Sequence, residues 1–232
     1  MASRRKKTTD EPRELATSGA LCLAFANSGA PVPDARRLVP LVAVRFDRYA
    51  DVVAWIRRMG AASAAEAERL LAAAAKEAAE AAAAAARART LRGALVRIFT
   101  AESAGKRARA ADLKTLNDAL VPALAARRLV AAERGCGWTW EDGGGLDRAL
   151  WPVALSAAEL LTSADVSRVR QCADRKCPRL FVDRGRSQPR LWCDMRACGN
   201  RAKNRRLYRR HRDSGHPLGW RYQSPDAPKP DR

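Results

Sequence analysis

Six cysteines occur in this 232-residue chain, and four of them form two pairs with the same spacing. Cys172 and Cys177 are separated by four residues, as are Cys193 and Cys198, and fifteen residues lie between the pairs. Zinc prefers four ligands at the corners of a tetrahedron, and thiolates from two separate turns can supply them. We therefore predict that these four side chains hold one structural zinc ion.

The alternative for the paired cysteines is a set of buried free thiols or a redox pair. Two residues between ligands is the common spacing in zinc sites, and four is looser, but two identical pairs in one segment favour zinc. Gly199, directly after Cys198, suits a tight turn behind the last ligand. Cys22 and Cys136 have no partner in the sequence, and we expect both to be buried.

The positive charge of the chain is concentrated around the paired cysteines. The chain carries 44 Lys and Arg against 25 Asp and Glu, which gives a formal net charge of +19. Residues 168–212 hold sixteen of the cations and three of the acids, so about two thirds of the excess lies there. A general arginine bias would spread the charge evenly. The segment therefore predicts a polyanionic partner.

Residues 201–212 are predicted to form a helix directly after the second cysteine pair. Arg201, Arg205, Arg209 and Arg212 recur at helical spacing and share one face. A helix with such a face fits the major groove of duplex DNA, where arginine contacts guanine edges or phosphates. The alternative is a merely solvated basic face. The candidate nucleic-acid-binding residues are Arg184, Arg186, Arg190, Arg201, Lys203, Arg205, Arg206, Arg209, Arg210 and Arg212.

The residues between the cysteine pairs are expected to position both pairs. Residues 180–182 and 191–192 are predicted to be strands, joined by a polar turn at 184–188. Asn200 and Arg201 follow the last cysteine, and we expect them to brace the zinc knuckle. The alternative for Asn200 is a contact with adenine.

Most of the chain before the cysteines is predicted to be helical, because apolar residues recur there with a helical period and alanine has the highest helix propensity. The Ala-rich stretch is expected to break near Thr90, and Pro122 is expected to end or kink the helix that begins at residue 110. Two short strands are predicted around Gly135-Cys136. The predicted helices cover 47–59, 63–101, 110–121 and 150–163, and the strands cover 128–133 and 137–141.

The last cysteine opens the sequence Cys198-Gly199-Asn200-Arg201, and Leu180-Phe181-Val182-Asp183 lies between the cysteine pairs. Residues 169–212 thereby resemble the CGNR zinc finger family. That family usually carries a mainly helical ABATE domain before the finger. Residues 21–27 and 91–95 are similar to its early segment and its central helix. The resemblance implies a stress-induced transcription regulator.

The expected architecture is mainly α with a small β-hairpin (α+β), a helical N-terminal domain followed by a treble-clef-like zinc finger. We expect the helical domain to have its own core and to sense a small-molecule ligand or stress. The predicted regions are a disordered basic N-terminus (1–16), the helical ABATE-like sensing domain (17–165), the CGNR zinc finger (168–213) and a disordered tail (214–232).

The leading hypothesis is a zinc-finger transcription regulator that binds specific double-stranded DNA sequences. The alternative is an RNA-binding or ribosome-associated zinc protein, which the same charge would serve. We do not expect an enzyme, because the sequence has no nucleophile motif and no Gly-rich phosphate loop. An export signal and a membrane span are also not expected, which predicts a cytoplasmic protein. One finger offers a small interface, so a homodimer is a further expectation.

Overall fold

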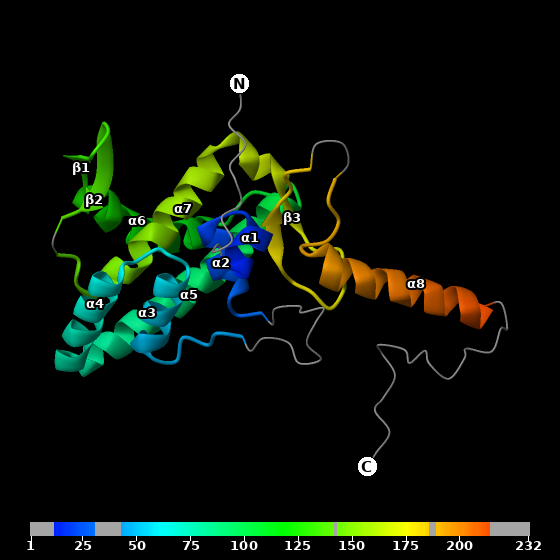
Figure 1. Ribbon diagram of the computed structural model, residues 1–232, viewed down its shortest axis with the longest axis horizontal. Coiled ribbons are helices and arrows are strands. Elements are labelled where there is room, and N and C mark those ends of the chain that lie inside the picture. Colours follow the sequence, from blue (N-terminus) through cyan, green and yellow to red (C-terminus); the bar gives the residue numbers. More distant parts are fainter. Residues whose placement is uncertain (1–11, 31–42, 142, 186–188, 214–232) are drawn as a thin grey trace, which may run out of the picture.

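A computed structural model describes residues 12–30, 43–141, 143–185 and 189–213 of the chain. These residues form a mainly helical body, two small antiparallel hairpins and a last helix that projects away from the body (Figure 1). The predicted fold class is therefore confirmed. The helices are α1 (Arg13–Ser18), α2 (Leu21–Asn27), α3 (Tyr49–Arg58), α4 (Ala64–Lys76), α5 (Ala78–Ser103), α6 (Ala110–Ala126), α7 (Trp151–Thr162) and α8 (Asn200–Asp213). The strands are β1 (Arg127–Ala131), β2 (Cys136–Trp140), β3 (Val169–Gln171) and β4 (Leu180–Val182).

The prediction that both ends of the chain are disordered is wrong for one short segment. Residues 1–11 and 214–232, predicted to be disordered, lie outside the described residues. Residues 13–16 belong to α1, so the prediction of disorder is wrong for them. Helix α1 packs against α2 and β4, and these contacts order it.

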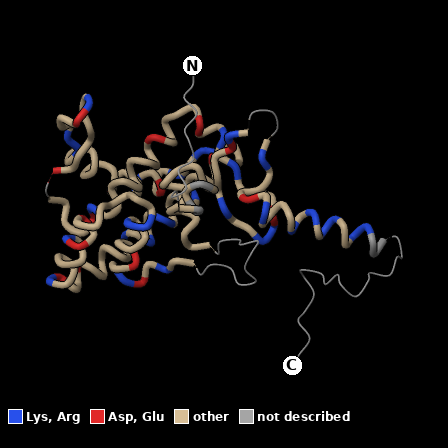
Figure 2. The backbone as a smooth tube through the Cα atoms, viewed as in Figure 1, with Lys and Arg blue, Asp and Glu red and all other residues tan. Residues whose placement is uncertain are grey.

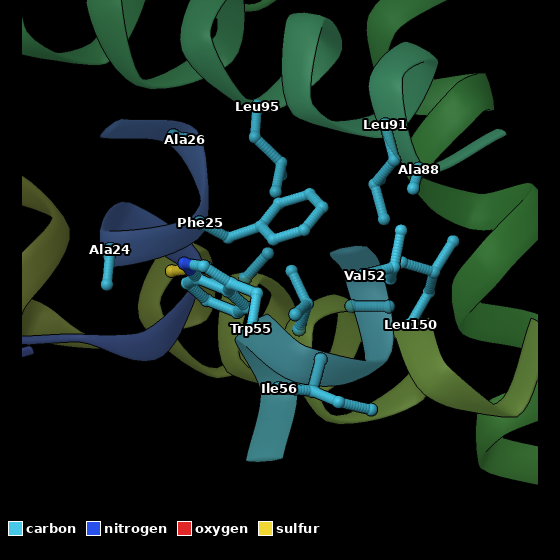
Figure 3. Close-up of a cluster of buried hydrophobic side chains, with 14 of the residues drawn as sticks. Ala24, Phe25, Ala26, Val52, Trp55, Ile56, Ala88, Leu91, Leu95 and Leu150 are labelled. Carbon is cyan, nitrogen blue, oxygen red and sulfur yellow. The ribbon is translucent and has the colours of Figure 1, made fainter. Parts of the chain in front are cut away.

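Helix α5 is the central element of the body, and its small alanines let neighbouring helices approach closely. Ala88, Leu91 and Leu95 recur at helical spacing and are buried. Figure 3 shows these three side chains facing residues of α2 and α3. The rings of Phe25 in α2 and Trp55 in α3 meet edge to face, with their centroids 5.1 Å apart. Such pairs stabilise a core beyond the area they bury.

Two helix boundaries differ from the prediction. The Ala-rich stretch breaks at Glu77, where φ is −132° and ψ is 66°, and not near Thr90. The Thr90 hydroxyl donates to the carbonyl of Ala86, which accommodates the threonine inside α5. Helix α6 continues through Pro122 to Ala126. The proline removes one backbone hydrogen bond, and the packing of α6 between α5 and α7 outweighs that loss.

The predicted hairpin is confirmed as β1 and β2, in which Leu129 lies opposite Trp138. The tip of the hairpin stands clear of the body (Figure 1), and Trp138 is 62% exposed, whereas the ring of Trp140 contacts Trp151 of α7. Cys136 is therefore exposed, and the expectation that it is buried is wrong. Cys22, in contrast, is fully buried in α2, as expected.

One of the two strands predicted between the cysteine pairs is present. Leu180–Val182 form the expected strand β4, which pairs with β3, whereas residues 191–192 are not a strand. The carbonyl of Leu191 instead accepts a hydrogen bond of 2.9 Å from the backbone N–H of Ala173, between the first two cysteines. The segment before Cys193 is thus tied to the turn of residues 172–177, the first knuckle; residues 193–198 form the second knuckle.

The hairpin of β3 and β4 completes the core of the helical body. Val169, Leu180 and Val182 are buried in the same hydrophobic cluster as the helices. The side-chain amide of Asn27, at the end of α2, donates to the carbonyl of Leu180 at 2.8 Å and accepts from its N–H at 2.8 Å. It also donates to the Ser18 hydroxyl at 3.0 Å. The expectation of a separate helical core is therefore wrong.

Candidate zinc centre and nucleic-acid interface

The four predicted zinc ligands come together in one buried cluster. Their sulfur atoms all lie within 4.8 Å of one another. The Sγ atoms of Cys177 and Cys193 are 3.6 Å apart, and those of Cys193 and Cys198 are 3.7 Å apart. Four sulfurs bound tetrahedrally to zinc at about 2.3 Å lie about 3.8 Å from one another. The cluster therefore fits one zinc ion, as the spacing predicted.

Each cysteine pair encloses a tight turn that contains an aspartate. In the first turn, the carbonyl of Asp174 accepts from the N–H of Cys177 at 2.7 Å. In the second, the carboxylate of Asp194 accepts from the backbone N–H groups two and three residues later, at 2.8 and 3.2 Å. Gly199 was expected to permit a tight turn, but its φ is not positive. The reason for glycine is space, because a Cβ there would lie 3.1 Å from the sulfur of Met195.

Crowding separates the pKa values of the four thiols. Hydrogen bonds from Cys177 and Cys193 lower the pKa of Cys172. Hydrogen bonds with Cys172 and Cys177 raise the pKa of Cys198. Thiols this close cannot all ionise unless a cation balances their charge. A divalent metal ion supplies that charge and holds its sulfur ligands deprotonated.

Asp174 connects the cysteine cluster to α8. Its buried carboxylate accepts from Nε of Arg201 at 2.8 Å and from Arg205 at 3.0 Å. Arg201 also donates to Sγ of Cys198 at 3.0 Å, and the Asn200 amide donates to a backbone carbonyl of the second knuckle at 2.9 Å. Burial alone would raise the pKa of Asp174, but the hydrogen bond and charge of Arg201 hold that pKa below its usual range. Arg201 therefore braces the knuckle as predicted, whereas Asn200 adds only one exposed hydrogen bond to it.

Two of the predicted nucleic-acid-binding arginines hold the finger against the body. Arg190 is half-buried over the ring of Phe181, 4.2 Å from its centroid, and donates to the carbonyl of Thr17 at 2.9 Å. Arg184 donates to the carbonyl of Gly19 at 3.0 Å. The guanidinium groups of Arg184, Arg190, Arg201 and Arg205 thus all have partners within the protein.

The other predicted cations of the helix lie on its surface, and Figure 2 shows Lys and Arg along the length of α8. The exposed ones are Lys203, Arg206, Arg209 and Arg210. Arg186 lies outside the described residues, as does the side chain of Arg212. Nucleic-acid contact by any of these residues stays a prediction.

A groove of about 390 Å³ runs between the first knuckle and α8. Two of its cations, Arg175 and Lys176, were missed by the sequence analysis, which looked for basic residues in the turn and the helix. The signal that could have found them is an Arg-Lys pair between two metal ligands, where a knuckle exposes its tip. The groove is lined by Ala173, Arg175, Lys176, Ala202, Arg205, Arg206 and Arg209.

A smaller cleft, of about 200 Å³, lies in the helical body between α5, α6 and the 3₁₀ turn Gly145–Leu150. It combines an apolar wall with hydroxyl, carboxylate and guanidinium groups. This mixture is typical of sites for small organic molecules. Its lining residues are Arg87, Thr90, Leu91, Thr115, Asp118, Ala119, Pro122, Asp147 and Leu150.

Comparison with known families gives two matches, in the order expected from the sequence. Residues 19–164 match the ABATE family model, described as "Putative stress-induced transcription regulator". Residues 168–211 match the CGNR zinc finger family. No curated protein matches the chain. Among the described helices, none has the length and apolar character needed to cross a membrane.

Proposed function

Since the chain belongs to the ABATE family and continues into a CGNR zinc finger, we propose that it is a transcription regulator that binds duplex DNA through α8 and the basic surface beside it. The observation that carries this proposal is the gathering of exposed cations on α8 and on the first knuckle. The zinc ion has a structural role in it, because the thiolates fix the start of α8. The helical body is the regulatory part.

The geometry of α8 supports a contact with the major groove. The helix has 14 residues, which corresponds to a length of about 21 Å. It projects from the finger and leaves most of its surface open (Figure 1). The major groove of B-DNA is about 12 Å wide and admits one helix. Arg209 and Arg210 lie on the exposed part of α8, at a distance from the cysteine cluster.

Structured RNA is the alternative partner, because the charge alone would attract it equally. The deep and narrow major groove of an A-form duplex excludes a helix and its side chains. A projecting basic helix therefore favours DNA. An enzymatic role is less well supported, because four cysteine ligands close the metal site and leave no position for substrate.

A competition experiment tests the proposed partner. Zinc-loaded protein bound to a fluorescent DNA duplex is titrated with unlabelled DNA duplex or with an RNA hairpin of the same number of base pairs. We expect the DNA to displace the label at a lower concentration than the RNA does. If the RNA competes equally well or better, the proposal of a DNA-binding regulator fails in favour of an RNA-binding protein.

A variant of α8 tests whether the helix makes the contact. Arg209→Ala with Arg210→Ala should weaken duplex binding without releasing zinc, because both residues lie beyond the ligands. The matched control is Lys106→Ala with Arg107→Ala, an exposed pair in the loop between α5 and α6 that removes the same charge. Equal affinity of the two double variants would refute a role for α8.

The helical body would sense a small molecule through the cleft between α5 and α6. Support comes from its volume of about 200 Å³ and its mixed lining. Screening a metabolite library for compounds that raise the melting temperature tests this, with Ala119→Trp as the variant that fills the cleft.

We further propose that the protein acts in the cytoplasm and as a homodimer. Sedimentation velocity with and without a DNA duplex tests the dimer.

A further inference from the structure

The groove between the first knuckle and α8 has cations on both of its walls. Arg175 and Lys176 are exposed on the knuckle, and Arg206 and Arg209 are exposed on the facing side of α8. Ala202 lies between them, and its short side chain keeps the groove open. The two walls of the groove are some thirty residues apart in the sequence, so it is the fold that brings these cations to face each other.

The electrostatics of the groove favour an anion. The carboxylate of Asp174, which contacts α8 beside the groove, has a side chain that is 0% exposed and is neutralised by Arg201 and Arg205. It therefore does not compete for a ligand in the groove. Arg206 and Arg209 form no ion pair with any residue in the described part of the chain. Their charge is available to a partner.

The length of the groove points to a chain of anions and not to a single one. Its helical wall runs from Ala202 to Arg209, which are seven positions apart, and at a rise of about 1.5 Å per position this is about 10 Å. One strand of a DNA duplex carries a phosphate about every 3.4 Å along the helix axis. The wall is therefore long enough for two or three consecutive phosphates of one strand.

We propose that this groove binds the phosphodiester backbone of one DNA strand, with Arg175 and Lys176 of the first knuckle contacting phosphates opposite α8. The inference rests on the proposed DNA-binding function and adds a second binding wall to it. The knuckle grips the backbone at the edge of the major groove while α8 lies inside it. Contacts of this kind fix the register of a protein on the duplex and carry little sequence information.

The test uses the full-length, zinc-loaded protein and a fluorescent DNA duplex over a series of salt concentrations. The variant is Arg175→Ala with Lys176→Ala, and the matched control is Lys106→Ala with Arg107→Ala. Both pairs are adjacent, exposed and of equal charge. Zinc content and circular dichroism are measured for each protein, so that loss of the finger is recognised.

Each lost phosphate contact reduces the slope of log K against log salt by about 0.9, so two contacts reduce it by about 1.8. At 0.15 M salt, the same relation gives a DNA affinity about 30-fold weaker than that of the wild type when two phosphate contacts are lost. We expect this change for the knuckle variant, equally on unrelated duplex sequences, and a wild-type slope for the control.

Four results would overturn the proposal, and they differ in what they say about the DNA-binding function. If the wild type binds DNA and the knuckle variant keeps its slope, the groove does not hold the backbone, while the DNA-binding function stands. If the control loses as much as the knuckle variant, only the overall charge matters. If inorganic pyrophosphate at equal ionic strength binds the wild type and not the knuckle variant, but does not displace the duplex, the groove takes a small anion and not the DNA backbone. Failure of the wild type to bind any duplex refutes the proposed function itself.

Discussion

Replacing Asn27 by alanine should detach the finger from the helical body. The Asn27 amide accepts from the N–H of Leu180 and donates to its carbonyl, both at 2.8 Å. Leu180 is 1% exposed, so water cannot reach the two backbone groups after the amide is removed. A buried polar group without a partner costs about 1–3 kcal/mol, and two such groups cost about 2–6 kcal/mol. That is a large part of the stability of a typical domain.

The assay is urea denaturation of the zinc-loaded protein, followed by far-UV circular dichroism. The matched control is Asn200→Ala, because the Asn200 amide is exposed and makes one hydrogen bond to a helical carbonyl. Solvent can replace that bond, so we expect its loss to cost less than about 1 kcal/mol. If Asn27→Ala costs no more than Asn200→Ala, the amide does not hold the finger to the body, and the account of a shared core fails.

Three further predictions follow from the metal cluster, the unpaired cysteines and one buried aspartate. Cys193→Ser should release zinc and also lower the melting temperature of the helical body, since β3 and β4 complete its core; an unchanged body would mean that the two cores are independent. In zinc-loaded protein, Ellman's reagent should modify Cys136, which is exposed, and leave Cys22, whose pKa burial raises to about 12; two thiols modified in the native state would contradict this. Hydrogen bonds from Arg97 and Arg109 lower the pKa of Asp112. The ionised carboxylate therefore stabilises the folded protein at pH values above the ordinary aspartate pKa of about 3.9. This stabilisation is lost as the pH falls below that value. The stability difference between wild type and Asp112→Asn should accordingly shrink between about pH 5 and pH 2, and a difference independent of pH over that range would disprove the ion pairs.

Local chemistry made the zinc ligands and the first hairpin predictable. The cysteine spacing is short, and the four sulfurs come together from two turns that are close in the sequence. Gly135 adopts a φ of 73° between β1 and β2, as a tight turn signalled by glycine requires. These features depend on residues within a few positions of one another, and a single sequence displays them directly.

Features that depend on distant contacts were not predictable. Arg190 looked like a surface cation, but it lies against Phe181 and α1, which no spacing in the sequence indicates. Strand β3, the partner of β4, was not predicted because it is only three residues long and basic in the middle. The role of Asn27 is invisible in the sequence, since its partner lies 153 positions away.

The salt dependence of duplex binding by the wild-type, zinc-loaded protein tests the central claim most directly. If about five cations of α8 and the first knuckle neutralise phosphates, log K should fall with log salt at a slope of about −4 to −5. Fluorescence anisotropy of a labelled duplex at several salt concentrations measures that slope. A slope between 0 and about −1, or no binding at low salt, would show that the charge on this finger is a solvated face and that the protein does not act on DNA.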